Sequence, residues 1–264
     1  MDFKGKKILI TGASSGIGAA VAKHFATKGA ILFLSGRNLD ALQEVKSNCS
    51  QAEEVHIYPM DLSDYDGVAN QIKQIYQVHQ VIDILINNAG ITQRALAKDL
   101  PFEYDKKIID VDLLGTIAVT KAVLPHMLDR KSGTIVTITS LMGKIYTPLR
   151  TSYAAAKHGL HGYFDSLRTE ISDEGIQVLL VCPGFIHTNI SYNAIGPQGK
   201  KQEKMDEAIQ KGLAPEEVAK AIEKGICNKE EEVYVSGAKE MLGVYLTRFV
   251  PSLWSKVVKK IKVT

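Results

Sequence analysis

Short apolar runs alternate along the chain with longer segments in which apolar residues recur at helical spacing. The runs are rich in branched side chains and lie at residues 7–11, 31–35, 55–58, 82–86, 133–138, 177–181 and 233–235. Strands that are apolar throughout are typical of a parallel sheet, because helices cover both of its faces. The pattern therefore predicts a single-domain α/β fold, a doubly wound parallel sheet of about seven strands with helices on both faces.

The alternation stops between residues 185 and 213, where the chain becomes polar and loses its period. A loop of that length in a compact domain is usually functional, so we expect it to cover a substrate. We accordingly expect a catalytic domain at residues 1–238, which includes the substrate loop 185–213. A helical extension at residues 239–264, broken at Pro251, follows it.

The extension places apolar residues on one helical face and lysines on the others. The apolar residues are Leu253, Trp254, Val257, Val258 and Ile261. A basic amphipathic helix of this kind can lie on an anionic membrane surface. We favour the alternative that the apolar face packs on its own domain or on a second subunit, which would bury Trp254.

The composition excludes several functional classes. Of the 264 residues, 32 are basic and 29 acidic, and the net charge of +3 is too small to indicate a nucleic-acid partner. The three cysteines, Cys49, Cys182 and Cys227, have no CxxC spacing, and the seven histidines show no metal-binding spacing. We therefore expect neither a disulfide framework nor a metal site. No segment has the pattern of a signal peptide or a membrane span, which favours a cytoplasmic protein.

The first apolar run ends in a glycine-rich turn, Thr11-Gly12-Ala13-Ser14-Ser15-Gly16-Ile17-Gly18, which leads into a helical segment. At such a position glycines let the backbone approach a pyrophosphate, and the helix N-terminus supplies amide groups and a positive dipole. Tight turns also use glycine for steric reasons alone. The length of the pattern and its position favour a dinucleotide site, and hence a Rossmann-type fold.

Several motifs together resemble the short-chain dehydrogenase/reductase superfamily over about residues 5–190. They are the glycine turn, Asn87-Asn88-Ala89-Gly90, Ser140, Tyr153-x-x-x-Lys157 and Pro183-Gly184-x-x-x-Thr188. Residues 91–94 and 120–127 are similar to the branch that contains dehydrogenase/reductase member 7 and 11β-hydroxysteroid dehydrogenase. The resemblance implies an oxidoreductase with a nicotinamide cofactor.

By this resemblance, Asp61 and Leu62 would flank the adenine of the cofactor, and Thr188 would hold its carboxamide. The further cofactor contacts that it implies are Asn88, Ala89, Gly90, Tyr153, Lys157, Pro183, Gly184 and Ile186. Taken singly, Asp61 is typical of a solvated loop and the paired asparagines of a simple turn. Only their occurrence together indicates a site.

The end of the second apolar run distinguishes NADP from NAD. An NAD site usually has an acidic residue there to accept from the ribose hydroxyls. This chain has Ser35-Gly36-Arg37-Asn38 instead. The Arg37 guanidinium can pair with a 2′-phosphate, and Ser14 can add a hydroxyl, so we favour NADP. The alternative for Arg37 is a surface arginine at a helix start.

Tyr153 and Lys157 lie one helical turn apart, and Ser140 precedes them at the end of a strand. A phenol has a pKa of about 10, so it needs a neighbouring positive charge to exchange protons at neutral pH. We expect the Lys157 ammonium to supply that charge and to hold the nicotinamide ribose. Ser140 would then hydrogen-bond the substrate oxygen that Tyr153 protonates. A tyrosine–lysine pair alone is more often an exposed helix face.

One position departs from the family pattern, because Asp112 stands where the family usually has asparagine. That asparagine is thought to hold a water molecule that links the lysine to solvent. Asp112 can accept from the same water, and its charge would then be partly buried and paired with Lys157. It can instead hydrogen-bond local backbone. We include Asp112 among the candidate catalytic residues.

These observations predict an NADP(H)-dependent oxidoreductase that transfers hydride between the nicotinamide and a carbonyl or secondary alcohol. The branch resemblance suggests a hydrophobic ketone as substrate, but fold analogy does not fix the chemistry. The alternative is a non-catalytic nucleotide-sensing or interaction protein on the same fold. We expect a homodimer or homotetramer with no nucleic-acid partner, and we regard contact of the tail with a membrane as the less favoured option.

Overall fold

A seven-stranded parallel sheet runs through the centre of the protein, in the order β3-β2-β1-β4-β5-β6-β7. The computed structural model that we analyse describes residues 2–260. The strands are β1 (Lys7–Ile10), β2 (Ile31–Leu34), β3 (Glu54–Ile57), β4 (Ile84–Asn87), β5 (Gly133–Ile138), β6 (Ile176–Pro183) and β7 (Glu232–Val235). All neighbouring strands are parallel, which confirms the predicted doubly wound sheet.

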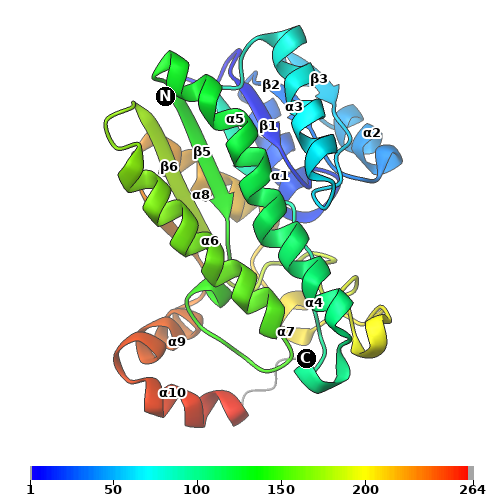
Figure 1. The fold of residues 1–264 in the computed structure, drawn as a ribbon, viewed down its shortest axis with the longest axis vertical. Coiled ribbons are helices and arrows are strands. Elements are labelled where there is room, and N and C mark those ends of the chain that lie inside the picture. The colour runs from blue at the N-terminus through cyan, green and yellow to red at the C-terminus, as the bar shows by residue number, and fades with distance from the viewer. Residues whose placement is uncertain (1, 261–264) are drawn as a thin grey trace.

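Helices cover both faces of the sheet (Figure 1). They are α1 (Gly16–Ala26), α2 (Leu39–Ser47), α3 (Tyr65–His79), α4 (Phe102–Ile109), α5 (Thr116–Arg130), α6 (Thr151–Glu170), α7 (Glu207–Gln210), α8 (Pro215–Cys227), α9 (Ala238–Phe249) and α10 (Pro251–Val257). Helices α1, α2 and α8 pack on one face, and α3, α5 and α6 pack on the other. Two buried apolar clusters, one on each side of the sheet, therefore form the core.

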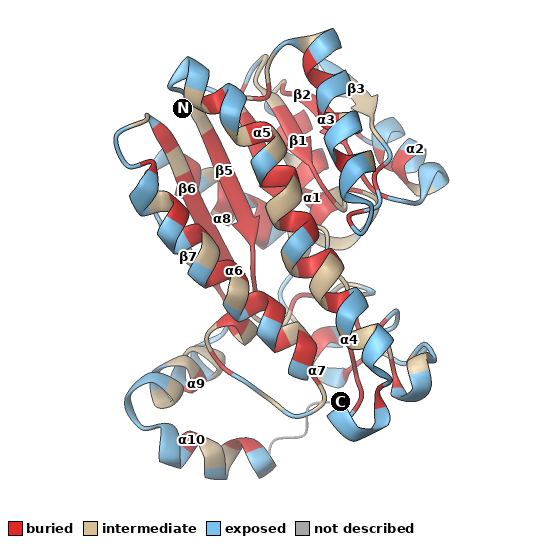
Figure 2. Cartoon of the chain, in the orientation of Figure 1, coloured by how far each residue is buried: buried red, intermediate tan, exposed pale blue. Residues whose placement is uncertain are grey.

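The continuous apolar runs follow from this double cover. Successive side chains of a strand point to opposite faces. In β6, Leu179 and Val181 join one cluster, whereas Val178 and Leu180 join the other. The helices are apolar on one side only, and Figure 2 shows buried strands beneath helices whose outer surfaces are exposed.

The sheet order reverses between β1 and β4, which are neighbours although two strands separate them in sequence. In open parallel sheets a crevice forms at such a point, beyond the carboxyl ends of the strands. The glycine-rich turn after β1 and the Asn87–Gly90 run after β4 both lie there. The topology alone therefore brings two of the predicted motifs together.

The polar segment 185–213 is ordered, although its sequence has no period. It contains α7 and a single 3₁₀ turn at Pro197–Gly199. The buried Asp206 carboxylate joins it to the domain, because its Oδ2 atom accepts from Arg94 Nε at 2.8 Å. An ion pair between distant residues therefore holds this segment in place, and hydrophobic periodicity does not predict such a contact.

The C-terminal helices pack partly on the domain, as we favoured. Trp254 and Val258 are buried, and they form a third apolar cluster with Leu141 and Ile145. Leu253, on the same predicted face, is 45% exposed, and Ile261 lies outside the described residues. Within residues 2–260, no helix is both long and apolar enough to cross a membrane.

A substitution at Phe164 can measure how much the packing of α6 stabilises this fold. Its side chain is fully buried against the sheet, so Phe164→Ala leaves a cavity. We expect the free energy of unfolding to fall by about 3–5 kcal/mol. Urea denaturation measures the loss, with Ser166→Ala, exposed on the same helix, as the control. A Phe164→Ala loss no larger than the control's would contradict the assignment.

Candidate active site

The glycine-rich turn brings the backbone of β1 close to that of β4. Gly12 has a φ of +64°, and a Cβ atom there would lie 2.7 Å from Ala89 Cα. A Cβ on Gly18 would lie 2.3 Å from the Gly12 carbonyl oxygen. No larger residue fits either position without displacing backbone. The Asn88 side chain fixes the contact, since its Nδ2 donates to Thr11 O at 2.9 Å and to Gly12 O at 3.1 Å.

A single cavity of about 870 Å³ opens beside this turn. Its lining includes all the predicted catalytic residues, Ser140, Tyr153, Lys157 and Asp112. It also includes every predicted cofactor residue except Gly18, whose place is under the turn. The structure thus brings together, from eight separate segments, the residues that the sequence analysis predicted.

Ser140, Tyr153 and Lys157 line the same cavity from two elements. Ser140 follows β5, and its Oγ accepts from Met142 N at 3.1 Å and donates to Pro183 O at 3.5 Å. Tyr153 lies in the first turn of α6, and the Lys157 Nζ atom is 5.6 Å from the centre of its ring.

Lys157 and Asp112 form a buried ion pair. Lys157 Nζ lies 3.6 Å from Asp112 Oδ2 and donates to Ile138 O at 3.4 Å. The Asp112 Oδ1 atom accepts from the Ile91 amide at 2.7 Å. Asp112 therefore does two of the things considered from sequence: it pairs with Lys157 and it hydrogen-bonds backbone.

The position of Asp112 raises the pKa of its carboxyl group. Burial raises this pKa to about 6, and the Lys157 ammonium and the Ile91 amide oppose the rise. Asp112 belongs to a π-helical turn, Asp110–Gly115, between α4 and α5. Such turns are frequent at functional sites.

The other end of the cavity is more open and carries positive charge. Arg37 is exposed there and Ser14 lies beside Gly36. Burial opposes ionisation of Asp61, but hydrogen bonds from Ser63 and the charges of Arg37 and Lys107 lower the pKa of its carboxyl group. Asp61 is therefore ionised at neutral pH, near the arginine.

Gln93 positions the helix that carries Tyr153, although sequence analysis gave it no role. Gln93 is fully buried, and its Oε1 accepts from Ser152 N at 3.0 Å and from Tyr153 N at 3.3 Å. These are amide groups of the first turn of α6, which have no partner within the helix. Gln93 thus holds the backbone of Tyr153 in place.

A buried cluster of opposite charges attaches the segment 185–213 to the wall of the cavity. Asp206 Oδ2 accepts from Arg94 Nε at 2.8 Å and from Arg150 Nη2 at 3.2 Å. Burial, followed by repulsion from Arg94, lowers the pKa of Arg150 to about 10, so it stays charged at neutral pH. Arg94 and Asp206 are 112 positions apart, so no local pattern could have paired them.

Comparison with known proteins shows the family to which the chain belongs. The sequence profile of the family described as short chain dehydrogenase matches residues 6–197. Dehydrogenase/reductase SDR family protein 7-like from Anopheles gambiae is 37% identical over 98% of this chain and 83% of its own length. Dehydrogenase/reductase SDR family member 7B from Bos taurus is 38% identical over 95% and 79%, respectively.

Solved structures share the fold. A short-chain dehydrogenase/reductase from Burkholderia phymatum, solved in complex with NAD, has a TM-score of 0.86 and 22% identity, over 96% of each chain. An alcohol dehydrogenase from the archaeon Thermococcus sibiricus, complexed with 5-hydroxy-NADP, has a TM-score of 0.76 and 26% identity. That match covers 89% of this chain and 97% of the archaeal one.

Because the Asp112 carboxyl group is buried, the free energy of unfolding should depend on pH. Its pKa in the folded protein, about 6, exceeds the ordinary 3.8, so the folded state binds this proton more tightly. The resulting stabilisation is fully present below pH 3.8 and is lost as pH rises through about 6. Between pH 5 and pH 7, we expect the wild type to lose about 1 kcal/mol relative to Asp112→Asn. Urea unfolding of both proteins at the two pH values measures this difference, and parallel pH dependences would refute it.

Proposed function

Because the chain belongs to the short-chain dehydrogenase family, in the branch of the dehydrogenase/reductase member 7 proteins, we propose that it is an NADP(H)-dependent oxidoreductase. It transfers hydride between the nicotinamide and a carbonyl or secondary alcohol. The observation that carries the proposal is one cavity that holds both the glycine-rich turn and the Ser140, Tyr153 and Lys157 side chains.

The residues of the cavity fit a dinucleotide. Gly12 has no side chain to block the turn. No side chain caps the N-terminal amide groups of α1, which begins at Gly16. A helix end of this kind attracts a phosphate group. Arg37 and Ser14 would hold the adenosine end, and Lys157 and Thr188 would hold the nicotinamide end. When bound, the reduced cofactor supplies the hydride.

The protein's own residues handle the proton. In the direction of reduction, the Tyr153 hydroxyl donates its proton to the substrate oxygen, while the Ser140 hydroxyl donates a hydrogen bond to the same oxygen. The Lys157 ammonium stabilises the phenolate that remains. Asp112 and the Ile138 carbonyl keep that ammonium in place, and Gln93 fixes the backbone of Tyr153.

Apolar side chains line the rest of the cavity and favour a hydrophobic ketone or alcohol. They come from the turn after Ser140, from the segment 185–213 and from the C-terminal helices: Ile145, Phe185, Ile190, Leu242, Leu246, Trp254 and Val257. The alternative, a non-catalytic nucleotide sensor, gives no role to a complete serine, tyrosine and lysine set inside the cavity. A panel of carbonyl compounds, assayed by loss of NADPH absorbance, distinguishes the two.

Tyr153→Phe should abolish turnover and leave cofactor affinity nearly unchanged. The ring and its packing remain, and only the acidic hydroxyl is lost. Steady-state kinetics on an active substrate and fluorescence titration of NADPH measure the two effects. If the variant kept most of its kcat, Tyr153 would not be the proton donor.

The exposed Arg37 should make NADPH bind more tightly than NADH. A charge-assisted contact with a phosphate contributes about 1.5–3 kcal/mol, which corresponds to a preference of about tenfold to a hundredfold. Gly36 offers no acceptor for the 2′-hydroxyl of NADH. Fluorescence titration of both reduced cofactors measures the preference.

The double change Gly36→Asp with Arg37→Leu should reverse this preference, because the new carboxylate accepts from the hydroxyl and repels the phosphate. Added salt should weaken NADPH binding more than NADH binding, since only NADPH pairs with the exposed arginine. Equal affinities for the two cofactors in the unchanged protein would exclude this role for Arg37.

A further inference from the structure

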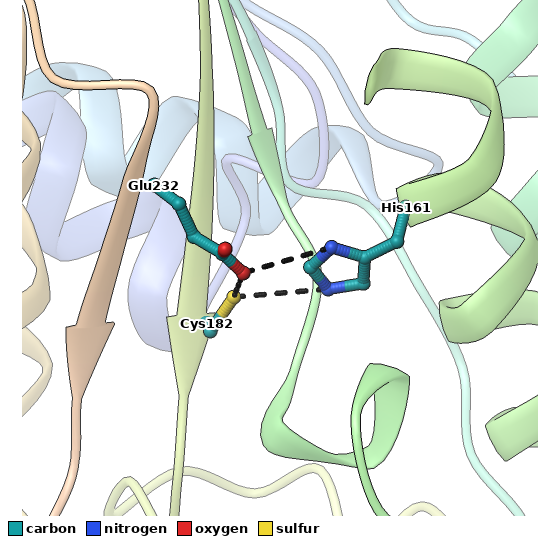
Figure 3. A group of neighbouring side chains, drawn as sticks. All are labelled: His161, Cys182 and Glu232. Carbon is teal, nitrogen blue, oxygen red and sulfur yellow. Dashed lines mark hydrogen bonds and ion pairs between the residues drawn. The ribbon is translucent and has the colours of Figure 1, made fainter. Parts of the chain in front are cut away.

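Three side chains with metal-binding atoms converge beneath the sheet edge, outside the reaction just described. Figure 3 shows His161 on α6, Cys182 on β6 and Glu232 on β7 pointing toward one another. The Cys182 Sγ atom lies 3.2 Å from Glu232 Oε1 and 3.7 Å from His161 Nε2. The His161 Nδ1 atom lies 3.7 Å from the same glutamate oxygen.

The fold holds these side chains in place. In the β6–β7 pairing, Leu180 lies opposite Glu232, so Cys182, two residues on, projects to the same face of the sheet. His161 projects from α6 toward this face. The imidazole is packed tightly, because a Cβ atom on Gly143 would lie 2.5 Å from His161 Cδ2. The cluster is therefore fixed before any ligand binds.

One atom of the cluster lacks the partner that its burial requires. His161 is only 6% exposed, and its Nδ1 atom has no hydrogen-bond partner among the described residues. Buried polar atoms are rarely left unpaired, because the lost hydration is not recovered. The proposed reaction does not use this imidazole, so the unpaired nitrogen needs another explanation.

We propose that His161, Cys182 and Glu232 form a binding site for a zinc ion. A nitrogen, a thiolate sulfur and a carboxylate oxygen are the ligands that Zn²⁺ takes in proteins, usually in tetrahedral geometry. Zinc–ligand bonds of about 2.0–2.3 Å place neighbouring ligand atoms about 3.3–3.6 Å apart. With Nδ1 as the histidine ligand, the distances of 3.2 and 3.7 Å from Glu232 Oε1 to Cys182 Sγ and to His161 Nδ1 are close to that arrangement. A water molecule would complete the coordination.

Binding involves proton release and no change of oxidation state. The Cys182 thiol loses its proton to solvent as the zinc–sulfur bond forms. The ion can enter from the edge of the sheet, because β7 is the outermost strand and the Glu232 side chain is 28% exposed. Cys227 is also on the surface but lies outside this cluster.

Lys144 competes with the proposed ion. Its Nζ atom lies 2.9 Å from Glu232 Oε1, the oxygen nearest to Cys182 and His161. A bound zinc ion would take this oxygen and repel the ammonium. Lys144 therefore lowers zinc affinity, and its removal should raise it. This direction of change is specific to a cation site at Glu232.

The test uses the full-length protein, freed of metal and titrated with Zn²⁺ against a chromophoric chelator. We expect one high-affinity ion per chain. Co²⁺, used as a spectroscopic probe, should give a thiolate-to-cobalt charge-transfer band. Cys182→Ser should remove the band and weaken zinc binding by more than about a hundredfold, since changes outside the ligand set alone cost about ten- to a hundredfold.

Three further variants sharpen the test. Lys144→Met keeps all three ligands and should tighten zinc binding by about tenfold or more, because it removes a nearby positive charge. It tests the site even where a ligand variant does not fold. Cys227→Ser and His158→Gln, each changing a potential ligand outside the cluster, should leave affinity and the cobalt band unchanged.

Two results would overturn the proposal. One is the absence of zinc uptake by the metal-free wild-type protein. The other is uptake that neither weakens in Cys182→Ser nor tightens in Lys144→Met, which would place the ion elsewhere on the surface. Circular dichroism of each variant shows whether it is folded.

Discussion

The buried ammonium of Lys157 is the constraint on which the active-site region depends. A charged group that is 3% exposed is costly unless it is paired and hydrogen-bonded. Asp112 supplies the opposite charge and the Ile138 carbonyl supplies an acceptor. Asp112 is itself fully buried, so it also needs the Ile91 amide. One buried cation therefore fixes the geometry of β5, the segment after β4, and the π-helical turn.

This requirement also explains the small residues around the site. A Cβ atom on Gly90 would lie 3.0 Å from Asp112 Oδ2, so a side chain there would press on the ion pair. Two residues earlier, Asn88 holds the glycine-rich turn through Thr11 and Gly12. The segment after β4 thus links the proposed cofactor turn to the Lys157–Asp112 pair. A displacement at either end would be transmitted through closely packed backbone.

Sequence reasoning succeeded where the determining interaction is local or follows from burial. The bounds of β5 follow from its apolar run, and the glycine motif predicted the turn. Sequence reasoning failed where the two partners of an interaction are far apart along the chain. Neither the anchoring of segment 185–213 by Arg94 and Asp206 nor the cap that Gln93 forms on α6 leaves a local signal. The zinc site that we propose likewise joins distant residues, since Cys182 and Glu232 are 50 positions apart, and spacing along the chain does not test it.

The C-terminal extension shows why the substrate is harder to derive than the reaction. Periodicity identified an apolar face, but it could not say which surface that face would cover. In the structure Trp254 packs on Gly243 and joins the cluster that contains Leu141, the residue after Ser140. The same helices form part of the cavity wall. The sheet and α6 therefore place the reacting groups, whereas the tail and segment 185–213 shape the space for the substrate.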